Sequence, residues 1–177
     1  MFKKRVISES ILENKFAQVW VETVIYTLIG LSVIGILLAV VNPKIDSMKD
    51  KLAIEQSIDS MDNIHKLINE IGVAGNRRII DLKVGKGVFV IDSENDVLYW
   101  EIESSYKFGE VGAEIPFGNL KVLTTEASPW KVKIFVEYSQ DLKFDNENEG
   151  SKEFMQAPTP YSLFVENLGS NIINFRE

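Results

Sequence analysis

The chain has 177 residues, no cysteine, a formal net charge of −7 and a pI of about 4.9. The lack of cysteine excludes disulfides, thiolate metal sites and cysteine nucleophiles. The acidic balance argues against a nucleic-acid partner, because such a partner requires basic surface. The length leaves room for one ordinary globular domain and an anchor.

The first predicted element is an apolar helix over residues 19–41, which carries a single charged side chain, Glu22. As a helix it would be roughly 35 Å long, enough to cross a hydrocarbon core of about 30 Å. A secretory signal has a shorter apolar stretch followed by a small-residue cleavage site. Here the polar Asn42, Pro43 and Lys44 follow, so we expect the anchor to be retained. Four basic residues precede the run and favour a cytoplasmic N-terminus: Lys3, Lys4, Arg5 and Lys15.

Glu22 has two interpretations. A carboxylate near one end of a membrane helix can reach the headgroups or be protonated, at a cost below the roughly 2.5–3.5 kcal/mol of mid-bilayer. Alternatively, it awaits a positive partner on another subunit. The preceding residues favour the second interpretation.

Residues 15–22, KFAQVWVE, resemble the class III signal peptide of archaeal type IV pilin-like proteins. The resemblance covers residues 15–41. In that family a peptidase cleaves the precursor before the apolar helix. A basic residue stands shortly before the cleavage site, and a small residue lies directly before it. Gln often opens the mature chain, and an acidic residue follows at position +5. The matching positions are Lys15, Ala17, Gln18 and Glu22.

This resemblance implies a cytoplasmic leader, residues 1–17, removed by a prepilin peptidase. It also implies that residues 18–43 anchor the precursor in the membrane and later assemble with copies of the chain or related pilins. The carboxylate of Glu22 would then pair with the amino group of Gln18 on a neighbouring subunit. Opposite charges attract strongly in a low dielectric.

The helical pattern continues over residues 44–74, after a kink or short break expected at Pro43. Gly72 is the expected stop. Apolar residues recur every three or four positions, and we expect this stripe to pack on the C-terminal domain, with a share of it open to neighbouring subunits. The stripe comprises Ile45, Met48, Leu52, Ile54, Ile58, Met61, Ile64, Ile68 and Ile71. The other faces carry Lys49, Asp50, Lys51, Glu55, Asp59, Asp62 and Lys66.

From residue 75 to residue 177 the pattern changes to the period of two that is typical of strands. Residues 87–92 and 97–103 read as a hairpin, and residues 161–168 and 171–175 read as two strands that close the chain across Gly169 and Ser170. Six or seven short strands predict an extracellular antiparallel β-sandwich-like domain, so the whole chain is α+β. Residues 140–160, rich in Asp, Glu, Asn and Pro, are expected to form an exposed loop.

Candidate chemical sites are few. Residues 145–150 resemble the first half of a calcium loop, but the twelfth position, Gln156, supplies no carboxylate, so we expect no tight calcium site. Asp92, Glu94 and Asp96 are explained by turn chemistry. The single histidine, His65, is expected to pack or to face solvent. We therefore expect no catalytic residues, no metal and no cofactor.

The sequence thus predicts a structural subunit, major or minor, of an archaeal type IV pilus-like surface filament, and not an enzyme. Its precursor would be a single-pass membrane protein, and its β domain would lie at the cell surface. The alternative is an uncleaved, signal-anchored surface domain that binds or senses a ligand. Such an anchor would need neither the Ala17–Gln18 junction nor Glu22.

Overall fold

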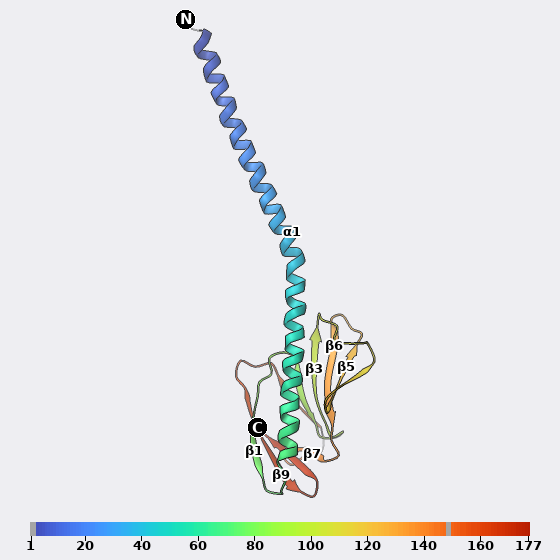
Figure 1. The fold of residues 1–177 in the computed structure, drawn as a ribbon. Coiled ribbons are helices and arrows are strands. Elements are labelled where there is room, and N and C mark those ends of the chain that lie inside the picture. Colours follow the sequence, from blue (N-terminus) through green and yellow to red (C-terminus); the bar gives the residue numbers. More distant parts are fainter. Residues whose placement is uncertain (1–2, 148–149) are drawn as a thin grey trace. The chain divides into compact units, whose positions relative to one another are not determined.

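The computed structural model describes residues 3–147 and 150–177, with side chains from residue 19 onward. The chain forms two compact units, Met1–Ile45 and Asp46–Glu177. The described residues hold one helix and ten strands (Figure 1). These are α1 (Lys3–Glu70), β1 (Arg77–Leu82), β2 (Val88–Asp92), β3 (Val97–Ser104), β4 (Glu114–Phe117), β5 (Leu120–Thr125), β6 (Trp130–Glu137), β7 (Asp141–Phe144), β8 (Ser151–Met155), β9 (Tyr161–Gly169) and β10 (Ile172–Arg176).

Helix α1 is continuous through Pro43, where a kink or a short break was expected, so there is no break at that residue. Pro43 removes one backbone hydrogen bond, and the turns on either side keep their helical pairing. The expected stop at Gly72 is confirmed, because the helix ends two residues earlier and Gly72 adopts a φ of 60°. The Asn76 side chain then caps this end by donating a hydrogen bond to the carbonyl of Ile71 at 2.8 Å.

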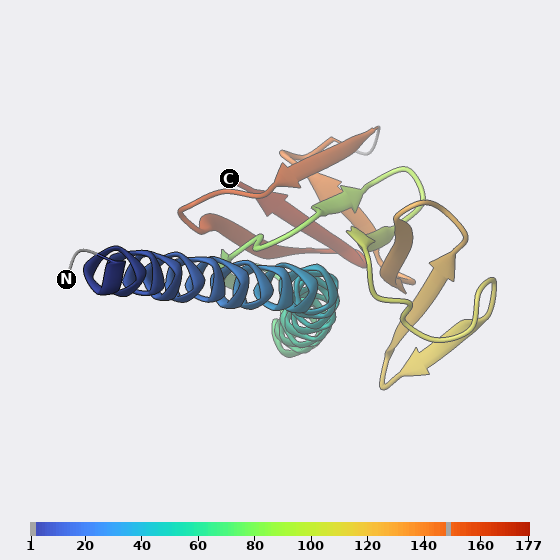
Figure 2. The same cartoon turned by 90° about the horizontal axis from the view of Figure 1, so that it is seen from above.

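The unit Asp46–Glu177 contains two sheets, so the α+β prediction is confirmed. One sheet has the strand order β1-β9-β10-β7, and the other has the order β4-β5-β6-β3-β2-β8. Neighbouring strands pair antiparallel except β10 and β7, which are parallel. The expected hairpin β2–β3 is present, and the two strands expected at the end of the chain, β9 and β10, also pair antiparallel. In Figure 2 the yellow strands β4 and β5 of the six-stranded sheet lie apart from the dark red strand β10 of the four-stranded sheet.

The exposed loop predicted over residues 140–160 is wrong in part. Strands β7 and β8 both lie inside this segment, where Leu142 and Phe154 are almost completely buried. The acidic composition concealed them because each strand contains only two apolar side chains. These residues form strands because each segment pairs with the border of a different sheet, β7 with β10 and β8 with β2, and not because of a local pattern.

The core lies between the two sheets and residues 46–70 of α1. The lower part of the helical stripe is buried as expected, through Ile54, Ile58, Met61, Ile64, Ile68 and Ile71. These side chains join inward-facing residues of both sheets in one cluster. The upper part is not covered within its unit, since Met48 is 67% and Leu52 55% exposed.

Candidate membrane and assembly helix

The N-terminal part of α1 is long and apolar enough to cross a membrane. Its most apolar window of 18 residues has a mean hydropathy of 2.7, and none of that window is buried in the described structure. Apolar side chains are exposed on all sides of the helix from Val19 to Val41. A helix that is apolar all round requires either lipid or other protein to cover it.

Three hydroxyl groups in this segment are satisfied inside the helix. The side chains of Thr23, Thr27 and Ser32 each donate a hydrogen bond to the carbonyl four residues earlier, at 2.9, 2.8 and 2.7 Å. Hydroxyls bonded in this way do not need water. The segment can therefore enter hydrocarbon without leaving these polar groups unsatisfied.

The residues of the expected processing site lie on the same helix. Lys15, Ala17 and Gln18 belong to α1, and their side chains are outside the described residues. Glu22 follows Gln18 by four positions, so the two residues share one helix face. The Glu22 side chain is exposed. This spacing places the carboxylate about one helical turn from the position where cleavage would create an amino group.

Two glycines of the apolar segment have open space beside them in the described structure. A Cβ atom added at Gly30 or at Gly35 would meet no described atom within 4 Å. Small residues allow membrane helices to approach closely. Glycine is also an ordinary component of membrane helices, so the two positions alone do not decide between contact and composition.

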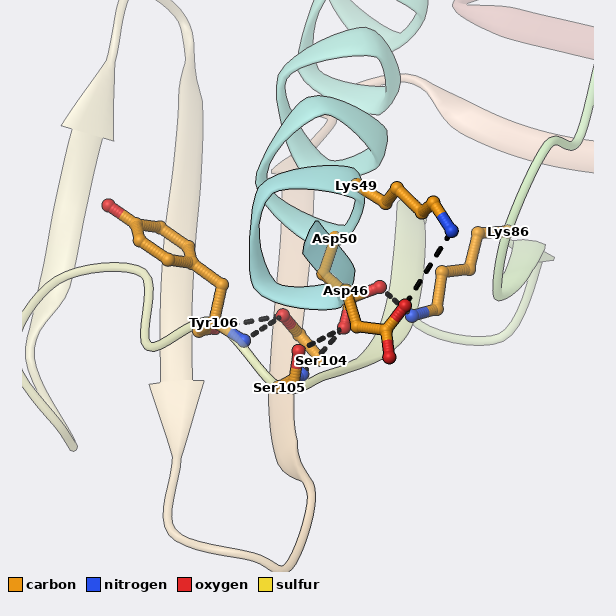
Figure 3. Close-up of polar contacts among 7 residues, drawn as sticks. All are labelled: Asp46, Lys49, Asp50, Lys86, Ser104, Ser105 and Tyr106. Carbon is orange, nitrogen blue, oxygen red and sulfur yellow. Dashed lines mark hydrogen bonds and ion pairs between the residues drawn. The ribbon is translucent and has the colours of Figure 1, made fainter. Parts of the chain in front are cut away.

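A polar cluster fixes the beginning of the second unit, near the point where α1 enters it (Figure 3). Asp50 is only 9% exposed, although the sequence placed it on a polar helix face. Its carboxylate accepts hydrogen bonds from the Lys86 ammonium group, from the Ser105 backbone N–H at 2.7 Å and from the Ser105 hydroxyl at 2.8 Å. The cluster ties α1 to the segment before β2 and to the end of β3.

The charge of Asp50 is stabilised despite its burial. Burial alone would raise the pKa of the carboxyl, but the hydrogen bonds from Lys86 and Ser105 outweigh it and hold the pKa below its ordinary value. Nothing in the local sequence distinguishes Asp50 from the exposed Asp46, whose ion pair with Lys49 spans 3.6 Å. Both partners of Asp50 are more than 35 residues away, so no local pattern signals the cluster.

The single histidine takes part in a second contact between helix and sheet. His65 Nδ1 lies 3.1 Å from the Tyr138 hydroxyl, and His65 Nε2 lies 2.9 Å from the Asn69 amide nitrogen. Burial raises the pKa of the Tyr138 hydroxyl. Both ring nitrogens of His65 are engaged, which fits the expected packing role.

In the acidic turn between β2 and β3, Asp92 follows the expected turn chemistry, because its Oδ1 accepts hydrogen bonds from the backbone N–H groups of Glu94 and Asn95. Asp96 also makes a tertiary contact, since its Oδ1 accepts a hydrogen bond from the backbone N–H of Leu142 in β7. Within the part of the chain that the structure describes, no three His, Asp or Glu side chains gather closely enough to hold a metal ion.

No protein-family model, curated protein or solved structure matches this chain. Function is therefore inferred from the chain's own residues and their arrangement. Three features bear on the function: an apolar helical segment, an acidic residue near its start, and a domain with its own core that follows in the sequence.

Proposed function

We propose that this protein is a structural subunit of a type IV pilus-like surface filament of the archaeal type. Its precursor is a single-pass membrane protein with a cytoplasmic N-terminus. A prepilin peptidase cuts it between Ala17 and Gln18, and the trimmed chain assembles through α1 with copies of itself or related pilins. The β domain lies at the cell surface, and the protein carries out no enzymatic reaction.

The observation that carries the proposal is the order of residues at the start of the apolar helix. A basic residue, a small residue, a glutamine and an acidic residue occur as Lys15, Ala17, Gln18 and Glu22, directly before or within the apolar segment. A simple anchor has no use for a carboxylate at this depth, because it makes insertion more costly. A filament subunit gains from it, because the carboxylate can pair with a buried amine of its neighbour.

The division of the chain supports the same function. The unit Asp46–Glu177 has its own core, to which residues 54–71 contribute the helical side chains. The apolar part of Met1–Ile45 is therefore not needed to complete that core. It remains available for lipid in the precursor and for neighbouring helices in a filament.

The proposal predicts how the apolar helix changes its surroundings. In the membrane, lipid covers the side chains that are exposed from Val19 to Val41. In a filament, the same side chains pack on equivalent helices, and Gly30 and Gly35 permit close approach. Pairing of Glu22 with the amine of Gln18 would offset the cost of burying each charge alone.

Mass spectrometry of the protein from its native membrane and from shed surface material tests this function. A chain that begins at Gln18 and is enriched in filaments would support it. A chain found only with residues 1–17 attached, and only in the membrane, would refute it. That result would favour the alternative, an uncleaved anchored domain that binds or senses a ligand.

A further inference from the structure

Strand β1 is a border strand of its sheet, and residues 79–83 line a hollow together with Ser60, Asn63 and Leu67 of α1. Among the described residues it pairs only with β9, and in Figure 1 it lies at the outer side of that strand. Its inward side chains, Ile80 and Leu82, are buried, whereas Ile79 on the outer face is 61% exposed. An unpaired strand edge is a template for pairing with another chain.

The outer face of β1 carries one apolar residue between two opposite charges. Arg77 and Asp81 flank Ile79 on this face, each two positions away. On the neighbouring strand, Phe164 lies opposite Ile79 and Glu166 opposite Arg77. The exposed Ile79 and Phe164 therefore form a short row of apolar side chains across the outer face of the sheet, and this row ends at the edge of β1.

We propose that β1 is a self-complementary contact surface whose partner is the β1 strand of a second copy of this chain. The two strands pair antiparallel about a two-fold axis at Ile79. In this register Ile79 opposes its own equivalent, and Arg77 of each copy opposes Asp81 of the other. Directly opposite residues share a face and interact, so both charge pairs are attractive.

The neighbouring two-fold registers are less favourable. Centring the pair one residue later would set Arg77 against Lys83 and would place the carboxylate of Asp81 against Ile79. Centring it one residue earlier would place two Arg78 guanidinium groups opposite each other. Like charges directly opposite are destabilising, so the charges of this strand select the register at Ile79.

The existing contacts of the two charged residues leave them able to join the second copy. Arg77 forms an ion pair with Glu166 at 3.6 Å and remains 46% exposed. Asp81 accepts a hydrogen bond from Ser162 at 3.2 Å and is exposed. Across the junction the charges would then alternate as Glu166, Arg77 and the second copy's Asp81.

The contact goes beyond the proposed function, because it needs no filament to form. If the chain does assemble as proposed, the symmetry of the β1 pair determines which chains it can join. The β1 pair is related by a two-fold rotation, whereas copies within one filament are related by a rotation and a rise along its axis. The β1 pair would therefore join chains of two neighbouring filaments.

Disulfide trapping tests the pair on the full chain, solubilised in detergent at high concentration. The chain has no cysteine, so single introduced thiols report without background. In the proposed register the two Ile79 Cα atoms lie about 4.5–5.5 Å apart, within the range of about 4.4–6.8 Å for a disulfide. Ile79→Cys should therefore give a covalent dimer on mild oxidation.

Lys83→Cys is the control, because Lys83 is exposed, directly follows the same strand and belongs to neither charge pair. In the proposed register the two equivalents of this position would be roughly 26 Å apart along the strands, too far for a disulfide. Equal dimer yields from Ile79→Cys and Lys83→Cys would overturn the proposal. So would the absence of a dimer from Ile79→Cys when near-ultraviolet circular dichroism shows a folded domain.

Charge reversal in the Ile79→Cys background completes the test. Arg77→Asp and Asp81→Arg should each lower the dimer yield about tenfold, because each turns two attractive pairs into repulsive ones. A mixture of the two variants should restore it, because each then meets the opposite charge. Rescue in the mixture also shows that neither variant is misfolded. Unchanged yields from the single reversals, or no rescue in the mixture, would refute the register.

Discussion

Asp50→Ala should destabilise the domain Asp46–Glu177 much more than a neighbouring aspartate does. The substitution removes three hydrogen bonds to a carboxylate that is 9% exposed. A hydrogen bond to a charged group contributes about 1.5–3 kcal/mol. Lys86 is 36% exposed and Ser105 is exposed, so water can replace part of what is lost. We therefore expect a loss of about 2 kcal/mol of unfolding free energy in total, or roughly 6–10 °C in Tm.

The assay is thermal unfolding of the full chain in detergent, followed by near-ultraviolet circular dichroism. This signal reports the packing of aromatic side chains, among them the buried Trp100, rather than the helical content of the anchor. Asp46→Ala is the control. Its ion pair with Lys49 spans 3.6 Å between side chains that are 65% and 70% exposed. Such surface pairs contribute about 0–1 kcal/mol.

The pH dependence of the Asp50→Ala effect provides a second check. Because folding lowers the pKa of Asp50, its contribution is fully present above about pH 4, the ordinary range for aspartate. It is lost as the pH falls through the lowered folded-state pKa. The difference between the wild type and Asp50→Ala should therefore shrink below about pH 4. Equal effects of Asp50→Ala and Asp46→Ala, or a difference that persists unchanged in acid, would refute the reasoning.

Three further predictions concern the rest of the chain. Glu22→Gln should leave leader cleavage and membrane insertion intact but nearly abolish filaments in electron micrographs, because an unpaired buried amine costs about 3–5 kcal/mol, and Glu22→Asp should be intermediate. Abundant filaments from a cleaved Glu22→Gln protein would show that Glu22 only lies at the membrane interface. A chain from Lys44 to the C-terminus should be soluble, since the core is complete within it, and monomeric by sedimentation at concentrations too low for the proposed β1 pair to form. Aggregation of this folded fragment beyond a dimer would show that the exposed Met48 and Leu52 need neighbouring subunits. Residues 140–160 should bind no calcium tighter than about 10 µM by titration calorimetry, and a tighter site would contradict the missing carboxylate at Gln156.

Local periodicity determined the main elements of this chain. An apolar run longer than a bilayer is thick, a stripe at helical spacing from Ile54 to Ile71, and alternating strands around two short turns each signal their structure within a few residues. The physical reason is that helix and strand have different side-chain periods, so burial of one face leaves a readable pattern. The order of Lys15, Ala17, Gln18 and Glu22 is likewise a local signal.

Tertiary structure decided what depends on distant partners. Asp50 looks like any surface aspartate until Lys86 and Ser105 meet it, and β7 becomes a strand because β10 offers it a parallel edge. The open edge of β1 is equally hidden in the sequence, since a strand's place in its sheet depends on which other strands pair with it. Such pairings join residues that are far apart along the chain. The energy that they contribute therefore leaves no pattern in the spacing of neighbouring residues.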